Sequence, residues 1–129
     1  MNVPLHCDLD TEALARLAEL DPTGQSRLLK RLLDTFDKSL DRMLPQLEQA
    51  RDAADVQAVH LVAHTLKSSS ATVGAMALSR QCAMVEYLAR EGRLAEAVGG
   101  MRQLLLEAAA AREAVRRLVA KLETPASAA

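Results

Sequence analysis

Residues 60–75 carry side chains whose types and spacing suit the transfer of a phosphoryl group. Their sequence is HLVAHTLKSSSATVGA, so His64 is followed one helical turn later by Lys67 and then by three serines in a row. Neutral imidazole is abundant near neutral pH and can accept a phosphoryl group through a ring nitrogen. The phosphorylated ring carries about two negative charges, which no helix N-terminus neutralises in the middle of a helix. Lys67, at i+3, supplies a flexible cation on the adjacent turn.

This chemistry requires a histidine on the exposed face of a rigid helix. In the helix expected over residues 56–73, the core-facing side chains gather within about 80° of arc at about 100° per residue. They are Val59, Val62, Ala63, Leu66, Ser70 and Val73. His64 lies roughly 140° from the centre of that stripe. The sequence therefore predicts that His64 points away from the core, on a face shared with His60, Lys67, Ser68 and Ala71.

Apolar periodicity predicts further helices before and after this one. A short helix from Asp10 or Thr11 to about residue 20 is followed by the turn sequence DPTG. Longer patterns cover residues 25–51, 76–90 and 94–122. Pro45 predicts a kink near Asp41 or two abutting helices. The pair at residues 99–100, both glycine, predicts a weak point or a true break in the last helix.

The composition favours the same fold class. Of the 129 residues, 50% are apolar but only 2% are aromatic. The apolar residues are mostly alanine and leucine, which favours closely packed helices over a sheet. We therefore predict an all-α protein, an antiparallel up-down four-helix bundle with a short N-terminal cap helix, over residues 9–122. Residues 1–8 are expected to be a loose lead-in and residues 123–129 a disordered tail.

Charge and hydropathy exclude several classes of function. With 16 basic and 17 acidic residues, the net charge of -1 gives no electrostatic reason to bind nucleic acid or an anionic membrane. No run approaches the roughly 18 to 20 apolar residues of a membrane span, and the N-terminus is unlike a secretory signal. Cys7 and Cys82 lack CxxC spacing, which predicts free thiols in a reducing compartment. We expect a soluble, cytoplasmic monomer.

The residues around His64 resemble the signature of a known family. The segment HTLKSSS at residues 64–70, followed by VGA at residues 73–75, is similar to the motif of histidine-containing phosphotransfer (HPt) domains of bacterial multistep phosphorelays. The resemblance covers most of the chain and implies that His64 is phosphorylated and that Lys67 assists it. The family usually has glycine where this chain has Ser68, so a hydroxyl is added close to the phosphoryl group.

The resemblance also implicates the helix that follows. In similar domains a Gln or Glu on that helix binds the inner ring nitrogen of the histidine, and spacing places Glu86 at this position. A carboxylate that accepts Nδ1–H would fix the tautomer and leave Nε2 as the nucleophile. Arg90, one turn further on, is expected to have a weaker part in charge compensation. The predicted docking surface comprises His60, Leu61, Ser68, Ala71, Thr72, Ala75 and Arg90.

A phosphocarrier is the function that the resemblance implies. The chain has no Gly-rich phosphate-binding loop, so we expect it to obtain phosphate from another protein. The expected donor is the receiver domain of a hybrid sensor kinase and the expected acceptor that of a response regulator; Mg²⁺ would be bound by the receiver, and this chain would need no cofactor. The alternatives are a phosphodonor module of the chemotaxis-kinase type and an adaptor bundle without phosphotransfer. Zinc binding by His60 and His64, spaced i, i+4, lacks an evident third ligand.

Overall fold

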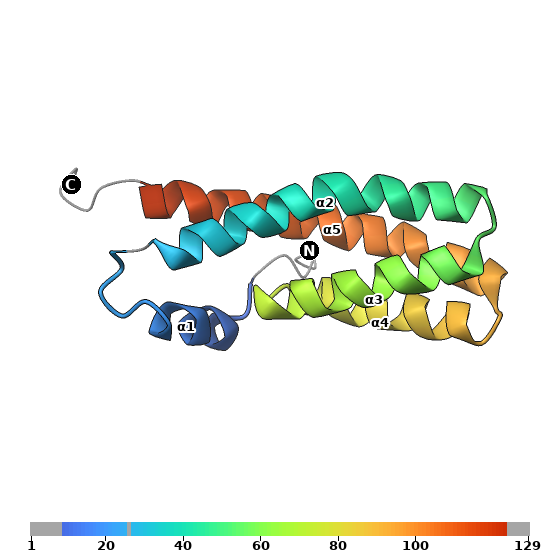
Figure 1. The fold of residues 1–129 in the computed structure, drawn as a ribbon, viewed down its shortest axis with the longest axis horizontal. Coiled ribbons are helices and arrows are strands. Elements are labelled where there is room, and N and C mark those ends of the chain that lie inside the picture. Colours follow the sequence, from blue (N-terminus) through green and yellow to red (C-terminus); the bar gives the residue numbers. More distant parts are fainter. Residues whose placement is uncertain (1–8, 26, 124–129) are drawn as a thin grey trace, which may run out of the picture.

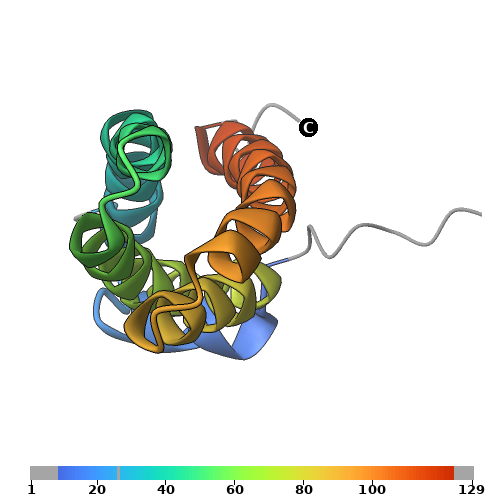
Figure 2. The same cartoon turned by 90° about the vertical axis from the view of Figure 1, so that its right-hand side faces the viewer.

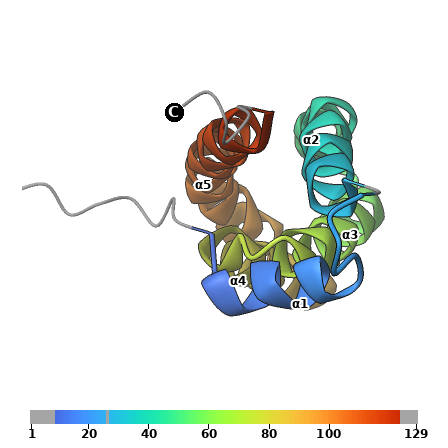
Figure 3. The ribbon, with the colours of Figure 1, turned by 90° about the vertical axis from the view of Figure 1, so that its left-hand side faces the viewer.

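Five helices form the part of the chain that the structure describes, residues 9–25 and 27–123. In this computed structural model they are α1 (Thr11–Glu19), α2 (Leu28–Asp52), α3 (Val56–Thr72), α4 (Met76–Arg90) and α5 (Leu94–Glu123). The four long helices run side by side along the molecule (Figure 1) and surround a common core when viewed along their axes (Figure 2). The short α1 lies across the end where α3 turns into α4 (Figure 3). The predicted bundle with its N-terminal cap helix is thus confirmed.

Aspartate side chains cap the start of two of the helices. The carboxylates of Asp10 and Asp55 accept hydrogen bonds from the backbone N–H groups of Ala13 at 3.0 Å and Ala58 at 3.1 Å. Gly74, in the turn between α3 and α4, has a φ of +84° and accepts a hydrogen bond from the Asp10 backbone N–H at 2.8 Å. A Cβ at Gly74 would lie 2.8 Å from that nitrogen. Glycine there allows α1 to fasten directly onto the α3–α4 turn.

Neither the proline in α2 nor the glycine pair in α5 breaks its helix. α2 continues through Pro45, and α5 continues through Gly99 and Gly100. Gly100 lies against α4, where its carbonyl accepts a hydrogen bond from the Gln81 side chain at 2.9 Å. A Cβ at Gly100 would lie 3.3 Å from Val85 Cγ2. Glycine at residue 100 thus allows α5 to lie close to α4, at a cost in helix propensity of about 1 kcal/mol relative to alanine.

The core consists of small and aliphatic side chains. The buried side of α3 matches the predicted stripe, except that Val62 is only partly buried. Fully buried leucines come from each long helix: Leu33, Leu40, Leu47, Leu66, Leu78 and Leu104. Cys82 is also fully buried and free, as predicted. Burial, together with the charge of Glu86, raises the pKa of the Cys82 thiol to about 12, so that it is a protonated core side chain.

The start of α2 and the end of α5 differ slightly from the prediction. α2 begins at Leu28, three residues later than expected, because the backbone of Arg27 is left-handed with a φ of 53°. Glu123 belongs to α5, so the predicted tail cannot start there. The predicted lead-in, Cys7 and the rest of the tail lie outside the described residues. Within the described part of the chain, no helix has both the length and the apolar character of a membrane span.

Candidate functional site

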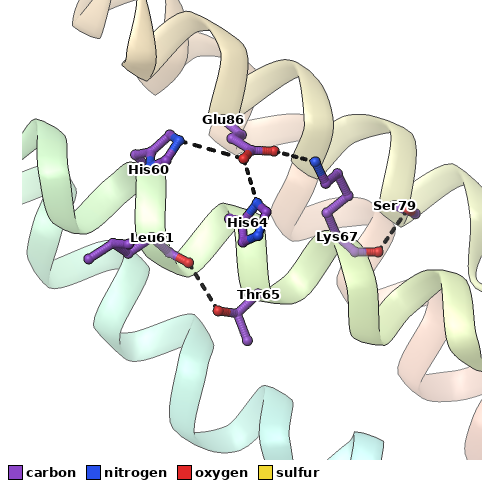
Figure 4. A network of polar contacts seen from close by, with 7 residues as sticks. All are labelled: His60, Leu61, His64, Thr65, Lys67, Ser79 and Glu86. Atoms are coloured by element: carbon purple, nitrogen blue, oxygen red, sulfur yellow. Dashed lines mark hydrogen bonds and ion pairs between the residues drawn. The ribbon is translucent and has the colours of Figure 1, made fainter.

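His64 lies in the middle of α3 with a half-exposed side chain. Of its side-chain surface, 56% is accessible to solvent, as the helical pattern predicted. Its Nδ1 lies 2.6 Å from Oε2 of Glu86 on α4 (Figure 4). An ionised carboxylate can only accept, so the contact favours the tautomer with the proton on Nδ1. The lone pair of the neutral ring is then on Nε2, the nitrogen on the other side of the ring.

Glu86 connects three basic side chains of α3. Its carboxylate is buried, with 7% of the side chain exposed. Oε1 lies 2.7 Å from Lys67 Nζ, while Oε2 contacts His64 and lies 3.5 Å from His60 Nε2 (Figure 4). Burial alone would raise the pKa of Glu86, but hydrogen bonds from Lys67 and His64 outweigh it and hold the pKa below its ordinary value. Glu86 is therefore ionised at neutral pH and accepts from both partners.

The packing of α3 against α4 brings these groups together. Ser79 Oγ on α4 donates a hydrogen bond to the backbone carbonyl of Lys67 at 2.9 Å (Figure 4). Glu86 follows Ser79 by seven residues, about two helical turns, and so lies on the same face of α4. The bond belongs to the same register of α3 against α4 that places Glu86 opposite His64. Sequence reasoning missed Ser79, whose only signal is a serine among the mostly apolar residues on the buried side of α4.

Most of the predicted docking residues lie at the surface near His64. Leu61 is 54% exposed on α3. Three more are exposed, namely Ser68, Thr72 and Arg90. Ala71 is partly buried. Arg90 also places its guanidinium 5.9 Å from the centre of the Tyr87 ring, and Tyr87 is 47% exposed. Tyr87 was not among the predicted residues, although it is the only tyrosine in the chain.

Ala75 does not belong to this surface, and its prediction was wrong. It is 4% exposed because the chain turns sharply after α3. Its backbone N–H donates to the carbonyl of Ser70 at 2.8 Å, which draws it under the end of the helix. His60 also differs from an ordinary surface residue: it is 25% exposed, and its ring is directed to Glu86 (Figure 4).

The hydroxyl groups near His64 fall into two kinds. Those of Thr65, Ser69 and Thr72 donate to backbone carbonyls of α3. The hydroxyl of Ser68 has no hydrogen-bond partner among the described residues and is exposed. At i+4 from His64, Ser68 is therefore the hydroxyl that remains available to a group bound on the imidazole.

The polar groups around Glu86 are already paired with one another. Both Glu86 oxygens already face basic side chains, Lys67 on Oε1 and two histidines on Oε2. In residues 9–25 and 27–123, no group of three or more His, Cys, Asp or Glu side chains is placed to hold a metal. A carboxylate that accepts from basic neighbours is instead suited to orient a nucleophilic imidazole.

Comparisons with known proteins agree with this arrangement. A family model described as the Hpt domain matches residues 31–124. The crystal structure of histidine-containing phosphotransfer protein B (HptB) from Pseudomonas aeruginosa PAO1 is similar, with a TM-score of 0.80 and 31% sequence identity over 93% of this chain and 98% of that chain. Comparison with curated proteins gives no match.

Proposed function

Because the chain belongs to the Hpt domain family, whose members carry phosphoryl groups on histidine in phosphorelays, we propose that His64 is its phosphorylated residue. The observation that carries the proposal is the 2.6 Å contact between His64 Nδ1 and Glu86 Oε2. With its Nδ1 held by an ionised carboxylate, a half-exposed ring offers Nε2 as a nucleophile to an approaching protein.

The proposed transfer starts from an aspartyl phosphate on a receiver domain. His64 Nε2 attacks the phosphorus, the N–P bond forms as the P–O bond to aspartate breaks, and the aspartate leaves as a free carboxylate. The ring keeps its Nδ1 proton and gains positive charge as the bond forms. The anionic Glu86 stabilises that charge from 2.6 Å away. In the second half of the relay, the aspartate of another receiver attacks the phosphorus and His64 returns to its neutral form.

Lys67 is proposed to compensate the charge of the phosphoryl group. Its side chain is 35% exposed and its Nζ lies beside Glu86. A four-carbon stem allows the ammonium group to move toward a phosphoryl group on the neighbouring turn. Because His64 lies in the middle of α3, no helix N-terminus assists, and a mobile cation is the remaining source of positive charge on this helix.

The partners are proposed to be receiver domains, one from a hybrid sensor kinase and one from a response regulator. The face around His64 combines an exposed apolar residue, Leu61, with the small side chains of Ser68, Ala71 and Thr72. A low-relief strip of this kind allows another protein to come close to the imidazole. Mg²⁺ would be bound by the receiver.

The test is a labelling experiment with a matched control. We expect a phosphorylated receiver to place acid-labile, base-stable phosphate on the protein, and the His64→Gln variant to remain unlabelled. Arg117→Ala, an exposed position on α5, should label like the wild type. Labelling only by a kinase core with ATP would favour the chemotaxis-type phosphodonor instead. Absence of phosphate on His64 with every receiver and kinase offered would overturn the proposal and leave the adaptor bundle.

A further inference from the structure

His60 lies one turn before His64 on α3 and faces the same carboxylate. Its Nε2 is 3.5 Å from Glu86 Oε2, the oxygen that His64 Nδ1 contacts at 2.6 Å (Figure 4). The two imidazole rings are nearly parallel, at 17°, with centroids 6.3 Å apart. The His60 side chain is 25% exposed, less than half the value of His64. His60 is therefore directed into the helix interface and not toward an approaching partner.

The shared carboxylate explains what an inward-facing His60 can do. The terminal torsion of a glutamate side chain is soft, so one contact does not define the plane of its carboxylate. Lys67 holds Oε1 of Glu86, and His64 itself is the group that has to be oriented. The His60 Nε2 lies 3.5 Å from Oε2, an electrostatic contact longer than a standard hydrogen bond, and this contact restrains the oxygen independently of His64. Ionised carboxylate oxygens have lone pairs for both donors.

We propose that His60 is a positioning residue for phosphotransfer, acting on His64 through Glu86. It holds Oε2 in place, so that the carboxylate keeps the proton of His64 on Nδ1 and the lone pair on Nε2. Its effect on transfer rests on the proposed function of His64, whereas its effect on the imidazole tautomer does not. This role differs from docking: a docking residue changes the affinity for the receiver, while a positioning residue changes the rate of transfer within the complex.

Two substitutions of His60 distinguish the effect of its N–H from the effect of the space that its side chain fills. His60→Leu replaces the imidazole with an apolar side chain of similar size, so this half-buried space stays filled but the N–H is lost. His60→Gln offers an amide N–H at a similar reach and should restore the wild-type behaviour. Arg117→Ala, an exposed position on α5, is the control. Circular dichroism and urea unfolding establish that each variant is folded, and His60→Gln keeps the donor in place even if the leucine is poorly tolerated.

The first measurement concerns the unphosphorylated protein and uses ¹⁵N NMR of the imidazole nitrogens at a pH where His64 is neutral. We expect the Nδ1–H tautomer of His64 to predominate in the wild type and in His60→Gln. In His60→Leu, the ¹⁵N shifts should move toward those of a tautomer mixture. Unchanged His64 shifts in His60→Leu would overturn the inference, whether or not any receiver labels the protein.

The second measurement is single-turnover transfer from a phosphorylated receiver. We expect His60→Leu to lower the transfer rate constant about 3- to 10-fold with the half-saturating receiver concentration unchanged, and His60→Gln to recover most of the loss. A change in half-saturation alone would assign His60 to docking and overturn the positioning role. If the wild type accepts no phosphate while the tautomer shift is observed, the proposed function fails and the positioning of the ring stands.

Discussion

Lys67 Nζ lies 2.7 Å from Oε1 of the buried carboxylate of Glu86. The cation that would compensate a phosphoryl group is thus already paired before that group arrives. In the proposed transfer to His64, Lys67 would divide its charge between Glu86 and the phosphoryl group. The ammonium group of Lys67 lies one turn from His64, where it helps to keep Glu86 ionised.

Replacement of Lys67 tests whether it both pairs with Glu86 and compensates the phosphoryl charge. We expect Lys67→Met to lower the rate of phosphotransfer about 10- to 100-fold, because both the developing phosphoryl charge and Glu86 lose their cation. Lys67→Arg should lose less, about 3- to 10-fold, because its charge is kept but its planar group fits the site differently. Rates from a phosphorylated receiver measure both effects. Equal rates for Lys67→Met and the wild type would contradict the assigned role.

The lowered pKa of Glu86 predicts how stability depends on acid. Its pKa in the folded protein lies below the ordinary value of 4.5, so the ionised carboxylate stabilises the fold above that pH. This contribution is lost as the pH falls from the ordinary value through the lowered pKa. We expect the unfolding free energy of the wild type to decrease more steeply over this window than that of Glu86→Gln, as measured by urea unfolding. Parallel curves would show that Glu86 contributes no such linkage.

Gly74 provides a test of the contact between α1 and the α3–α4 turn. Gly74→Ala should destabilise the protein by about 2 to 4 kcal/mol, because φ is +84° and the new Cβ would lie 2.8 Å from the backbone nitrogen of Asp10. Gly24→Ala is the matched control: its φ is +72°, but nothing lies within 4 Å of the added Cβ. We expect it to cost about 1 kcal/mol. Thermal or urea unfolding compares the two, and equal losses would argue against the close approach.

Arg112 is predicted to hold α5 against α2. Its guanidinium pairs with Asp37 at 2.9 Å and with Asp41, and it is 19% exposed. Arg112→Ala should lower the unfolding free energy by about 1 to 3 kcal/mol. Arg117→Ala removes a pair with Glu113 on the same helix, where both side chains are exposed, and should cost at most about 0.5 kcal/mol. Urea unfolding should separate the two variants, and both should still be phosphorylated.

The unpartnered hydroxyl of Ser68 predicts an effect on the lifetime of phosphohistidine. A hydroxyl at i+4 can donate to a phosphoryl oxygen on His64, so Ser68→Ala should shorten the lifetime of the phosphorylated protein about 2- to 3-fold. Thr65→Val is the control, because the Thr65 hydroxyl already donates to the carbonyl of Leu61 at 3.1 Å. Loss of acid-labile phosphate with time provides the measurement. A lifetime that is equally short in both variants would point to a general effect on the helix.

Local patterns predicted the helices and the face of α3 on which His64 lies. The period of an α-helix is a property of the backbone, so the stripe that includes Val59 and Leu66 identifies the buried side without reference to any other helix. The resemblance to the family added Glu86, and the contact it predicted with His64 Nδ1 is present at 2.6 Å.

The sequence by itself therefore determined the all-helical bundle, the exposed position of His64 and the residues of the motif, because these depend on spacing along one helix. Only the tertiary structure decided which side chains share Glu86, that Ala75 is buried, and that α5 passes unbroken through Gly99 and Gly100. The physical reason is that the sharing of Glu86 and the unbroken α5 depend on the register and distance between neighbouring helices, and the burial of Ala75 depends on the turn after α3. That register comes from interhelix contacts such as Ser79 with the Lys67 carbonyl, which no periodicity within a single helix encodes.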